Sequence, residues 1–298
     1  MSLSITDLNV WIGDTHILRG ITLEVPDGQH VGIIGSSGSG KSMLSLAIMG
    51  LLPEGTRVEG SIRWDGREFV GAAERDLRSL RGTQISMMFQ DPATSLDPLM
   101  RLGKQIALPL RRHRGLRGDA LREAIDRALA EVALPDPARI ARSFPYEVSG
   151  GQRQRVALAM TLAASPSLLI ADEPTTALDV TVQRTVLDLL DAVTRERGVS
   201  LLFISHDLPV VTRMADRVIV VDAGRITDDV PVEVIRTAPD TLSDSARSIA
   251  SAARALDSVF ERIGAVRPDS QPGRVPGEAG EREGEPASLT DNEGNAHE

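Results

Sequence analysis

The chain has 298 residues, of which 41% are hydrophobic, with a formal net charge of −9 and no cysteine. This length can bury one large core or two modest ones, and the lack of cysteine excludes a disulfide framework, a thiol nucleophile and a cysteine-ligated cluster. The acidic balance argues against nucleic acid as a partner. Because no apolar run approaches ~18 residues and the first residues lack a basic stretch followed by an apolar core, we expect neither a membrane span nor a secretory signal.

The first informative motif is a glycine-rich loop between an apolar strand (residues 30–35, HVGIIG) and an apolar helix that stops before Pro53. Strand, loop ending in Gly-Lys-Ser, and helix are the context of a phosphate-binding P-loop. Lys41, one of only two lysines, would reach the β- and γ-phosphates, and the Ser42 hydroxyl would bind Mg²⁺. A chance glycine-serine turn is the alternative, and the flanking strand and helix argue against it. The expected phosphate-binding residues are Gly35, Ser36, Ser37, Gly38, Ser39, Gly40, Lys41 and Ser42.

The stretch from Lys41 to Ser149 leaves room for a β-rich lobe (about 55–88) and a helical lobe (about 91–160). Within the second, residues 119–134 have helical periodicity. Its apolar face would carry Leu121, Ile125, Ala128, Leu129 and Val132.

A helix with an unusual start follows in FPYEVSGGQRQRVALAM (144–160), entered through Ser-Gly-Gly-Gln. Two glycines just before a helix, expected over 153–164, cost conformational entropy. A helix N-terminus offers free backbone N–H groups and a partial positive charge. This start is therefore predicted to bind an anion, supplied from elsewhere in an assembly.

Two further apolar strands end in ionisable residues. Residues 167–173 (SLLIADE) end in Asp172 and Glu173, and residues 200–207 (SLLFISHD) end at His206. Buried parallel strands open at their carboxyl ends onto the ligand crevice, where Asp172 could hold Mg²⁺ and Glu173 could polarise the attacking water. His206 would contact a γ-phosphate. Two solvated acids and a structural histidine are the alternative. Another strand at 217–226 completes an alternation of strands and helices that predicts a parallel α/β sheet.

Together these motifs, with Gln90 after the β-rich lobe, resemble the ATP-binding-cassette (ABC) ATPases over about residues 3–230. The resemblance implies a P-loop NTPase core with an antiparallel β lobe and an α-helical lobe. It also implies that two cassettes meet head to tail, with ATP between the P-loop of one and the signature segment of the other. The signature residues that would bind the γ-phosphate of the partner's ATP are Ser149, Gly150, Gly151 and Gln152.

The resemblance gives three more residues a role. Asp179 resembles a residue that acts across the dimer interface, and Gln90 resembles one that touches Mg²⁺ and the attacking water. Trp11 resembles the upstream aromatic that stacks on adenine. Ile12, beside Gly13, occupies the more usual place of that aromatic, so whether Trp11 stacks on adenine stays open.

Residues 89–106 and 170–183 are similar to segments of peptide and nickel importer ATPases. This implies an ATP-hydrolysing, Mg²⁺-dependent subunit at the cytoplasmic face of the cell membrane. Its partners would be a second ATPase subunit (a paralogue or a second copy), two transmembrane permeases and, indirectly, an extracytoplasmic solute-binding protein. The His-Pro-Tyr stretch usual after residue 230 is absent, so a nickel or metal-chelate cargo stays open. A soluble non-transport ABC ATPase is a further alternative.

The expected domains are an ABC ATPase domain (1–230), a helical extension (231–264) and a disordered tail (265–298), which is rich in Pro, Gly, Glu and Ser. The extension carries an apolar stripe at helical spacing, which we expect to pack on its own domain or on a partner helix. The stripe consists of Leu242, Ala246, Ile249, Ala253, Leu256, Phe260 and Ile263.

Overall fold

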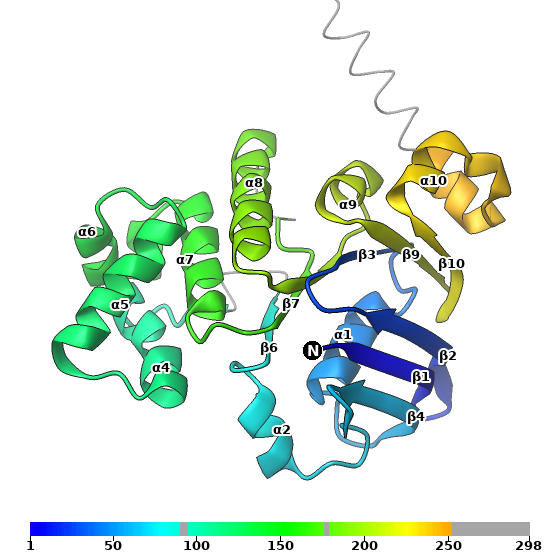
Figure 1. Ribbon diagram of the computed structural model, residues 1–298, viewed down its shortest axis with the longest axis horizontal. Helices are drawn as coiled ribbons and strands as arrows, with labels where there is room; N and C mark the ends of the chain where they lie inside the picture. The colour runs from blue at the N-terminus through cyan, green and yellow to red at the C-terminus, as the bar shows by residue number, and fades with distance from the viewer. Residues whose placement is uncertain (90–94, 176–178, 252–298) are drawn as a thin grey trace, which may run out of the picture. The chain divides into compact units, whose positions relative to one another are not determined.

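The structure is a computed structural model that describes residues 1–89, 95–175 and 179–251 (Figure 1). The chain divides into two compact units, Met1–Asp257 and Ser258–Glu298, and every described residue lies in the first. Gln90, the expected tail and the second half of the apolar stripe lie outside the described residues. Within the described ranges, no helix is both long and apolar enough to span a membrane.

A mostly parallel sheet forms the centre of the first unit. Its strand order is β10-β9-β3-β8-β7-β6, and all neighbours pair in parallel except β10 with β9. The strands β3, β7 and β8 are buried along their whole length, as apolar runs in a parallel sheet should be. The predicted α/β sheet is therefore confirmed. The strands are β3 (His30–Ile34), β6 (Ile85–Met88), β7 (Leu168–Asp172), β8 (Ser200–Ile204), β9 (Arg217–Asp222) and β10 (Arg225–Pro231).

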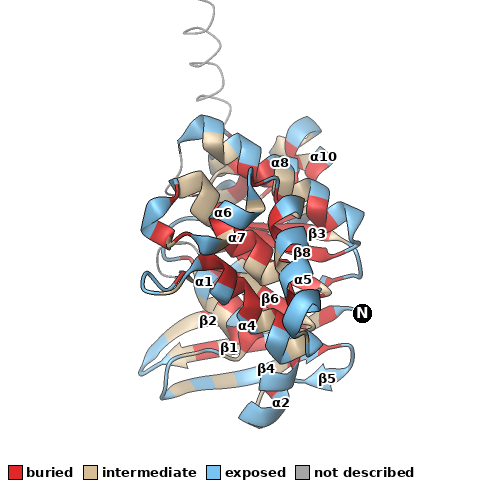
Figure 2. Cartoon of the chain, turned by 90° about the vertical axis from the view of Figure 1, so that its left-hand side faces the viewer, coloured by how far each residue is buried: buried red, intermediate tan, exposed pale blue. Residues whose placement is uncertain are grey.

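The two faces of this sheet face separate hydrophobic cores. Along β7, Leu169 and Ala171 join one core, while Leu168 and Ile170 join the other, because successive side chains of a strand point to opposite faces. Figure 1 shows α8 and α9 on one side of the sheet and α1 on the other, and Figure 2 shows the buried residues gathered in the strands and on the inner sides of the helices. The helices are α1 (Lys41–Met49), α8 (Val180–Glu196) and α9 (Leu208–Met214).

A second sheet is antiparallel, with the order β2-β1-β4-β5. The prediction of a β-rich lobe over about 55–88 was wrong at both ends, because β1 and β2 belong to this sheet and β6 belongs to the parallel one. The strand β1 is difficult to recognise in the sequence because a bulge near Asp7, whose φ is +46°, interrupts the alternation of apolar residues between Ile5 and Leu8. The strands are β1 (Leu3–Ile12), β2 (Thr15–Val25), β4 (Thr56–Trp64) and β5 (Arg67–Glu68).

The helical lobe, in the residues from 102 onward, includes helices grouped at the left of Figure 1. They are α4 (Leu102–Arg114), α5 (Gly118–Glu131), α6 (Pro137–Arg142) and α7 (Gly150–Leu162). The predicted apolar face of α5 is confirmed: Leu121, Ala128, Leu129 and Val132 are buried, and Ile125 is partly buried against the same core. Helix α7 begins at Gly150, three residues earlier than predicted, so both signature glycines lie in its first turn.

Shorter elements complete the described chain. They are α2 (Glu74–Leu80), α10 (Val232–Thr237) and the 3₁₀ turns Pro145–Glu147 and Pro239–Thr241. Residues 244–251 are helical. Leu242 and Ala246 of the predicted stripe are buried in the core that also holds Val232 and Ile235 of α10, and Ile249 packs against it.

Candidate nucleotide-binding site

The loop between β3 and α1 has a backbone that only glycine allows at several positions. A Cβ on Gly35 would lie 2.1 Å from the carbonyl oxygen of Val221 on β9. Gly38 and Gly40 have φ values of +79° and +106°. Gly40 is also the N-cap of α1 and supplies no capping side chain, so the first N–H groups of the helix remain available to an anion.

Lys41 lies folded back over this loop. Its Nζ donates hydrogen bonds to the carbonyl oxygens of Gly35 and Ser36, both at 2.8 Å, and the residue is 6% exposed. Burial lowers the pKa of this amine, while the nearby Glu173 and Asp172 carboxylates raise it and limit the effect. The amine is therefore fixed at the inner wall of the loop, where a phosphate would compete for its hydrogen bonds.

Asp172 and Ser42 fit a divalent cation. The Asp172 carboxylate, at the end of β7, accepts a hydrogen bond from the Ser42 hydroxyl, and burial raises its pKa. Its Oδ1 is buried and has no hydrogen-bond partner within the described part of the chain. A buried carboxylate oxygen without a partner is costly unless a ligand meets it, and hard cations such as Mg²⁺ prefer oxygen ligands.

Glu173 and His206 meet at the carboxyl ends of neighbouring strands. His206 lies two residues beyond the end of β8, and its Nδ1 is 3.1 Å from Oε1 of Glu173. Glu173 has a φ of +46°, unusual for a residue other than glycine, and its N–H donates to the Ile204 carbonyl at 2.8 Å. Strained backbone of this kind is typical of functional sites and here turns Glu173 away from the strand direction of Asp172.

Four of these residues line one cavity of about 520 Å³, and Asp172 lies outside its lining. Lys41, Ser42, Glu173 and His206 line it, with loop residues Ser37, Gly38 and Gly40, and with Ile17 and Met43. Ser36 and the buried Ser39 belong to the same loop without lining the cavity. Ile17 and Met43 were not predicted from the sequence as site residues. Burial in β2 alternates only from Ile21 to Val25, so no local pattern singles out Ile17.

The signature residues lie outside this cavity. Ser149 is exposed and caps α7: its Oγ accepts from Gln152 N–H at 3.2 Å, and Gln152 Oε1 accepts from Ser149 N–H at 3.0 Å. A Cβ on Gly151 would lie 2.5 Å from Cγ1 of Val182 on α8, so close packing of the two helices also requires this glycine. Gly150 is the first residue of the helix.

Asp179 is exposed and caps the next helix. Its Oδ1 accepts a hydrogen bond from the N–H of Val182 at 3.0 Å. Val180, the first residue of α8, is 82% exposed. The starts of α7 and α8 are therefore neighbours, joined by the contact between Gly151 and Val182.

Trp11 does not line the cavity. It pairs with His16 on β2 and with Arg57 on β4, so it stands between the two. The His16 ring stacks on it with centroids 4.2 Å apart, and the Arg57 guanidinium carbon lies 3.9 Å from the ring centroid. Because these neighbours come from opposite sides of β1, both faces of the indole are covered.

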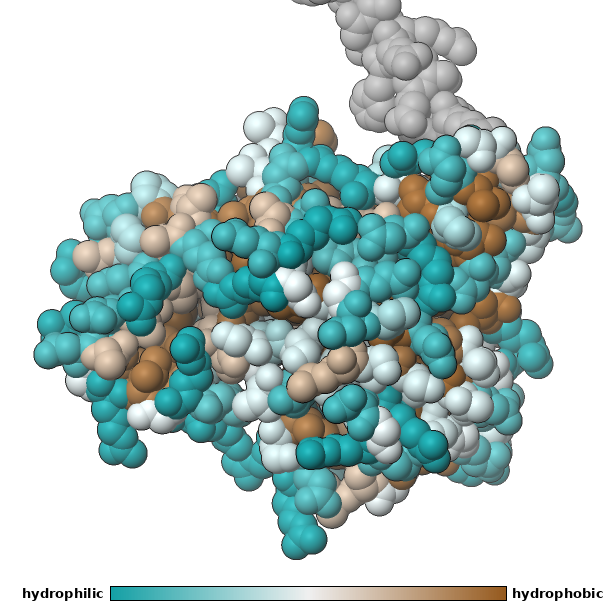
Figure 3. Space-filling view, in the orientation of Figure 1, coloured by the Kyte–Doolittle hydropathy of each residue, from teal (hydrophilic) through white to brown (hydrophobic). Residues whose placement is uncertain are grey.

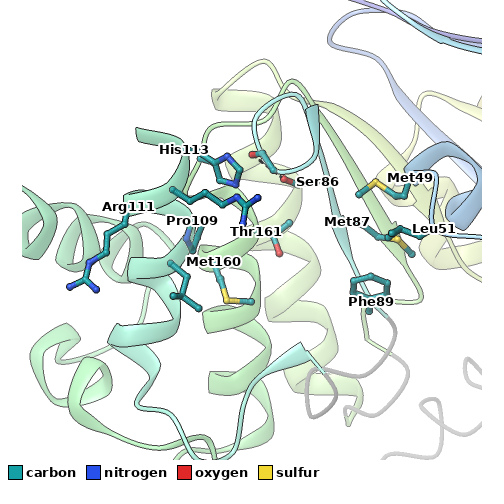
Figure 4. Close-up of a pocket in the computed structure, with 14 residues that line it drawn as sticks. Met49, Leu51, Ser86, Met87, Phe89, Pro109, Arg111, His113, Met160 and Thr161 are labelled. Carbon is teal, nitrogen blue, oxygen red and sulfur yellow. Dashed lines mark hydrogen bonds between the residues drawn. The ribbon is translucent and has the colours of Figure 1, made fainter. Parts of the chain in front are cut away.

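A second cavity of about 720 Å³ lies between β6 and the helices α4 and α7. In Figure 4, Met49, Leu51, Met87 and Phe89 face the helices across this cavity. The lining side chains Leu51, Phe89 and Leu108 are 40%, 42% and 53% exposed. On the face of the molecule in Figure 3, by contrast, hydrophobic residues appear in small groups between hydrophilic ones. This surface was not predicted from the sequence because its residues come from four separate segments.

Comparison with known proteins places this geometry in a family. A family model described as ABC transporter matches residues 18–176. The chain is 44% identical to the oligopeptide transport ATP-binding protein OppD of Bacillus subtilis (strain 168), over 75% of this chain and 63% of that protein. It is 45% identical to OppD of Salmonella typhimurium, over 75% of this chain and 68% of that protein. The chain thus spans about two thirds of the length of these curated relatives.

A solved structure has the same fold. It is a dimeric ATP-binding cassette in a post-hydrolysis state bound to ADP and Pi, with a TM-score of 0.68 and 29% sequence identity, and the match covers 77% of this chain and 98% of that one. The predicted ABC nucleotide-binding fold is therefore confirmed. The protein belongs to the ABC transporter family, as one of its ATP-binding subunits.

Proposed function

We propose that the chain is the ATP-hydrolysing subunit of an importer that takes up peptides or a related small solute. The observation that carries this proposal is the convergence of Lys41, Ser42, Asp172, Glu173 and His206 from three parallel strands at one loop. These relatives are oligopeptide transport proteins, which supports peptides over nickel or a metal chelate as the cargo. No described residue outside the nucleotide site favours the second cargo.

In this proposal Lys41 and the N–H groups at the start of α1 hold the β- and γ-phosphates of ATP. Ser42 and Asp172 would hold Mg²⁺, which neutralises phosphate charge when it is bound. Glu173 accepts the proton of the attacking water, and the contact of His206 with its Oε1 keeps the carboxylate oriented. Gln90, proposed to touch the same water and Mg²⁺, lies outside the described residues.

The proposed catalytic unit is a head-to-tail pair of ATPase subunits. Ser149 to Gln152 lie at an exposed helix start away from the chain's own cavity, so their anion would be the γ-phosphate held by the partner. Asp179 would act at the same surface, because α7 and α8 begin side by side. The dimeric arrangement of the related cassette supports this. The partner is a paralogue or a second copy of this chain.

The larger cavity is the proposed contact with the two permeases. A patch of exposed apolar side chains marks an interaction surface more often than it marks free surface. Here Leu51, Phe89 and Leu108 line one cavity between the core and the helical lobe. Contact there would place the chain at the cytoplasmic face of the membrane and link it only indirectly to a solute-binding protein.

We also propose the division into a cassette (1–230) and a helical extension (231–264). Burial of Leu242 and Ala246 supports an extension that packs on its own domain.

The two lysines of the chain offer a matched test of the site. Lys41→Ala removes the phosphate-binding amine, whereas Lys104→Ala removes an exposed one on α4. With Mg²⁺ present, ATP affinity should be lost in the first variant and unchanged in the second. Equal affinities of Lys41→Ala and wild type would contradict the proposed site. The cargo would follow from mass spectrometry of the ligand that co-purifies with the complete transporter and its binding protein.

A further inference from the structure

The end of α4 and the loop that follows it carry a cluster of exposed arginines. Residues 111–117 read RRHRGLR and contain no acidic residue. Within the described ranges, none of the arginine side chains in this stretch forms an ion pair or donates a hydrogen bond, whereas the exposed arginines of α5 pair with acidic residues of their own helix. The members of this arginine cluster are Arg111, Arg112, Arg114 and Arg117.

The cluster belongs to a basic lobe of an acidic chain. Residues 101–162, from the N-cap of α4 to the end of α7, hold 12 Lys and Arg against 6 Asp and Glu, which gives a formal net charge of +6. Because the whole chain has a net charge of −9, the rest of it carries −15. Charge concentrated in this way attracts an anionic partner to one part of the surface and keeps it from the remainder.

Stabilisation of α4 does not account for the cluster. A basic side chain near a helix C-terminus interacts with the free carbonyl groups, but this effect is confined to the last turn. Helix α4 ends at Arg114 with Gly115 as its C-cap, and Arg117 lies beyond it. Arginines this close together also repel one another unless an anion lies between them. An external anion is therefore the group that the cluster fits.

The cluster borders the larger cavity. Arg111 and Arg112 line that cavity, and Figure 4 shows the Arg111 side chain pointing away from Met87 and Phe89 on its far wall. Because this cavity is the proposed contact with the permeases, the cluster would lie at the margin of that contact, where the chain approaches the membrane.

We propose that the arginine cluster binds the anionic phospholipid headgroups of the cytoplasmic leaflet. This inference goes beyond the proposed function but rests on the membrane location that it includes. The cytoplasmic leaflet has a negative surface potential that attracts basic segments, and guanidinium groups pair well with phosphate oxygens. An acidic loop of a permease is the less suitable partner, because the cytoplasmic loops of membrane proteins carry an excess of Lys and Arg, which would repel the cluster.

Vesicle binding by the isolated full-length chain tests this inference. Co-sedimentation would be measured with vesicles of phosphatidylcholine alone and with vesicles of equal parts phosphatidylcholine and phosphatidylglycerol. The cluster variant replaces all four arginines of the cluster by glutamine. A control variant of the same net charge carries four substitutions at other exposed arginines, one each in β5, α2, α8 and β10: Arg67→Gln, Arg75→Gln, Arg184→Gln and Arg225→Gln. Binding of Mg²⁺-ATP by the same samples shows that each variant keeps a folded nucleotide site.

Wild type should bind the vesicles that contain phosphatidylglycerol and not those of phosphatidylcholine alone. Raising the salt from ~0.1 M to ~1 M should abolish this binding, because the Debye length falls from about 10 Å to about 3 Å. One arginine near an anionic surface contributes about fivefold in affinity, so the cluster variant should bind at least ~100-fold more weakly, and the control variant within about fivefold of wild type. No binding by wild type, equal binding to both kinds of vesicle, or equal losses in the two variants would overturn the inference.

Assembly with the permeases separates lipid from protein as the partner of the cluster. The double variant Arg114→Gln, Arg117→Gln changes only arginines that do not line the larger cavity, so its assembly with the permeases in lipid-free detergent should match that of wild type. Loss of assembly there would assign the cluster to an acidic permease segment and overturn the inference. A wild-type chain that binds the anionic vesicles but not Mg²⁺-ATP would instead refute the proposed function.

Discussion

Replacing Gly151 by alanine tests whether this signature glycine is needed for the packing of α7 on α8, in addition to its proposed role in binding an anion. The new Cβ would lie 2.5 Å from Cγ1 of Val182, although carbon atoms in contact sit ~3.5–4.0 Å apart. Val182 cannot easily rotate away, because a β-branched side chain in a helix has one strongly preferred rotamer. Overpacking of this kind destabilises a fold by ~1–3 kcal/mol. The higher helix propensity of alanine relative to glycine offsets up to ~1 kcal/mol of this loss.

We therefore expect Gly151→Ala to lower the free energy of unfolding by ~1–2 kcal/mol and the melting temperature by ~2–8 °C. Chemical denaturation of Gly151→Ala, Val182→Ala and the double variant forms a thermodynamic cycle. The double variant should be more stable than the two single effects predict, by ~1 kcal/mol, because the shorter side chain removes the clash. If the two single effects on the free energy of unfolding add within ~0.3–0.5 kcal/mol, residues 151 and 182 do not clash in Gly151→Ala. That result would refute the predicted steric clash.

Two further predictions concern other parts of the chain. Burial raises the pKa of Glu68, but hydrogen bonds from Ser61, Ile62, Val70 and Arg63 outweigh this and lower it from 4.5 to about 2. The ionised Glu68 therefore stabilises the fold above pH 4.5, and this stabilisation is lost as the pH falls toward 2. The difference in melting temperature between wild type and Glu68→Gln should be largest at pH 7 and should narrow below pH 4.5. A difference that stays constant with pH would contradict this. Ser149→Arg should leave the ATP affinity of the isolated chain nearly intact but abolish turnover at the site formed by this chain's signature segment and the partner's P-loop. Weakened ATP binding by the isolated chain would argue against the head-to-tail pair.

The sequence predicted the parallel sheet and the polar residues beside the smaller cavity because both depend on local signals. HVGII, LLIAD and SLLFI are apolar except for one polar residue at an end of each, as a strand buried on both faces requires. Lys41 and His206 follow such strands, Asp172 is the last residue of one, and the carboxyl ends of parallel strands meet at one edge.

Features that depend on irregular backbone or on distant contacts were not predictable in this way. The bulge at Asp7 disturbs the alternation of β1, so the antiparallel sheet was placed too late in the chain. A bulge in β2 brings Ile17 to the cavity, which no local motif indicates. The stacking of His16 and Arg57 on Trp11 depends on the register of three strands, and the contact of Gly151 with Val182 depends on how two helices pack.

The proposed role of Glu173 in hydrolysis is the central claim, and one comparison tests it most directly. ATP binding and turnover would be measured in the assembled transporter with Glu173→Gln, and with Glu196→Gln as a control at an exposed position near the end of α8. The amide keeps the shape of the carboxylate but cannot accept a proton from water. Glu173→Gln should bind ATP like wild type and lose far more than ~10-fold in turnover, where tenfold corresponds to ~1.4 kcal/mol of barrier. Glu196→Gln should be unaffected. Turnover by Glu173→Gln within ~10-fold of wild type would contradict the proposed role of Glu173.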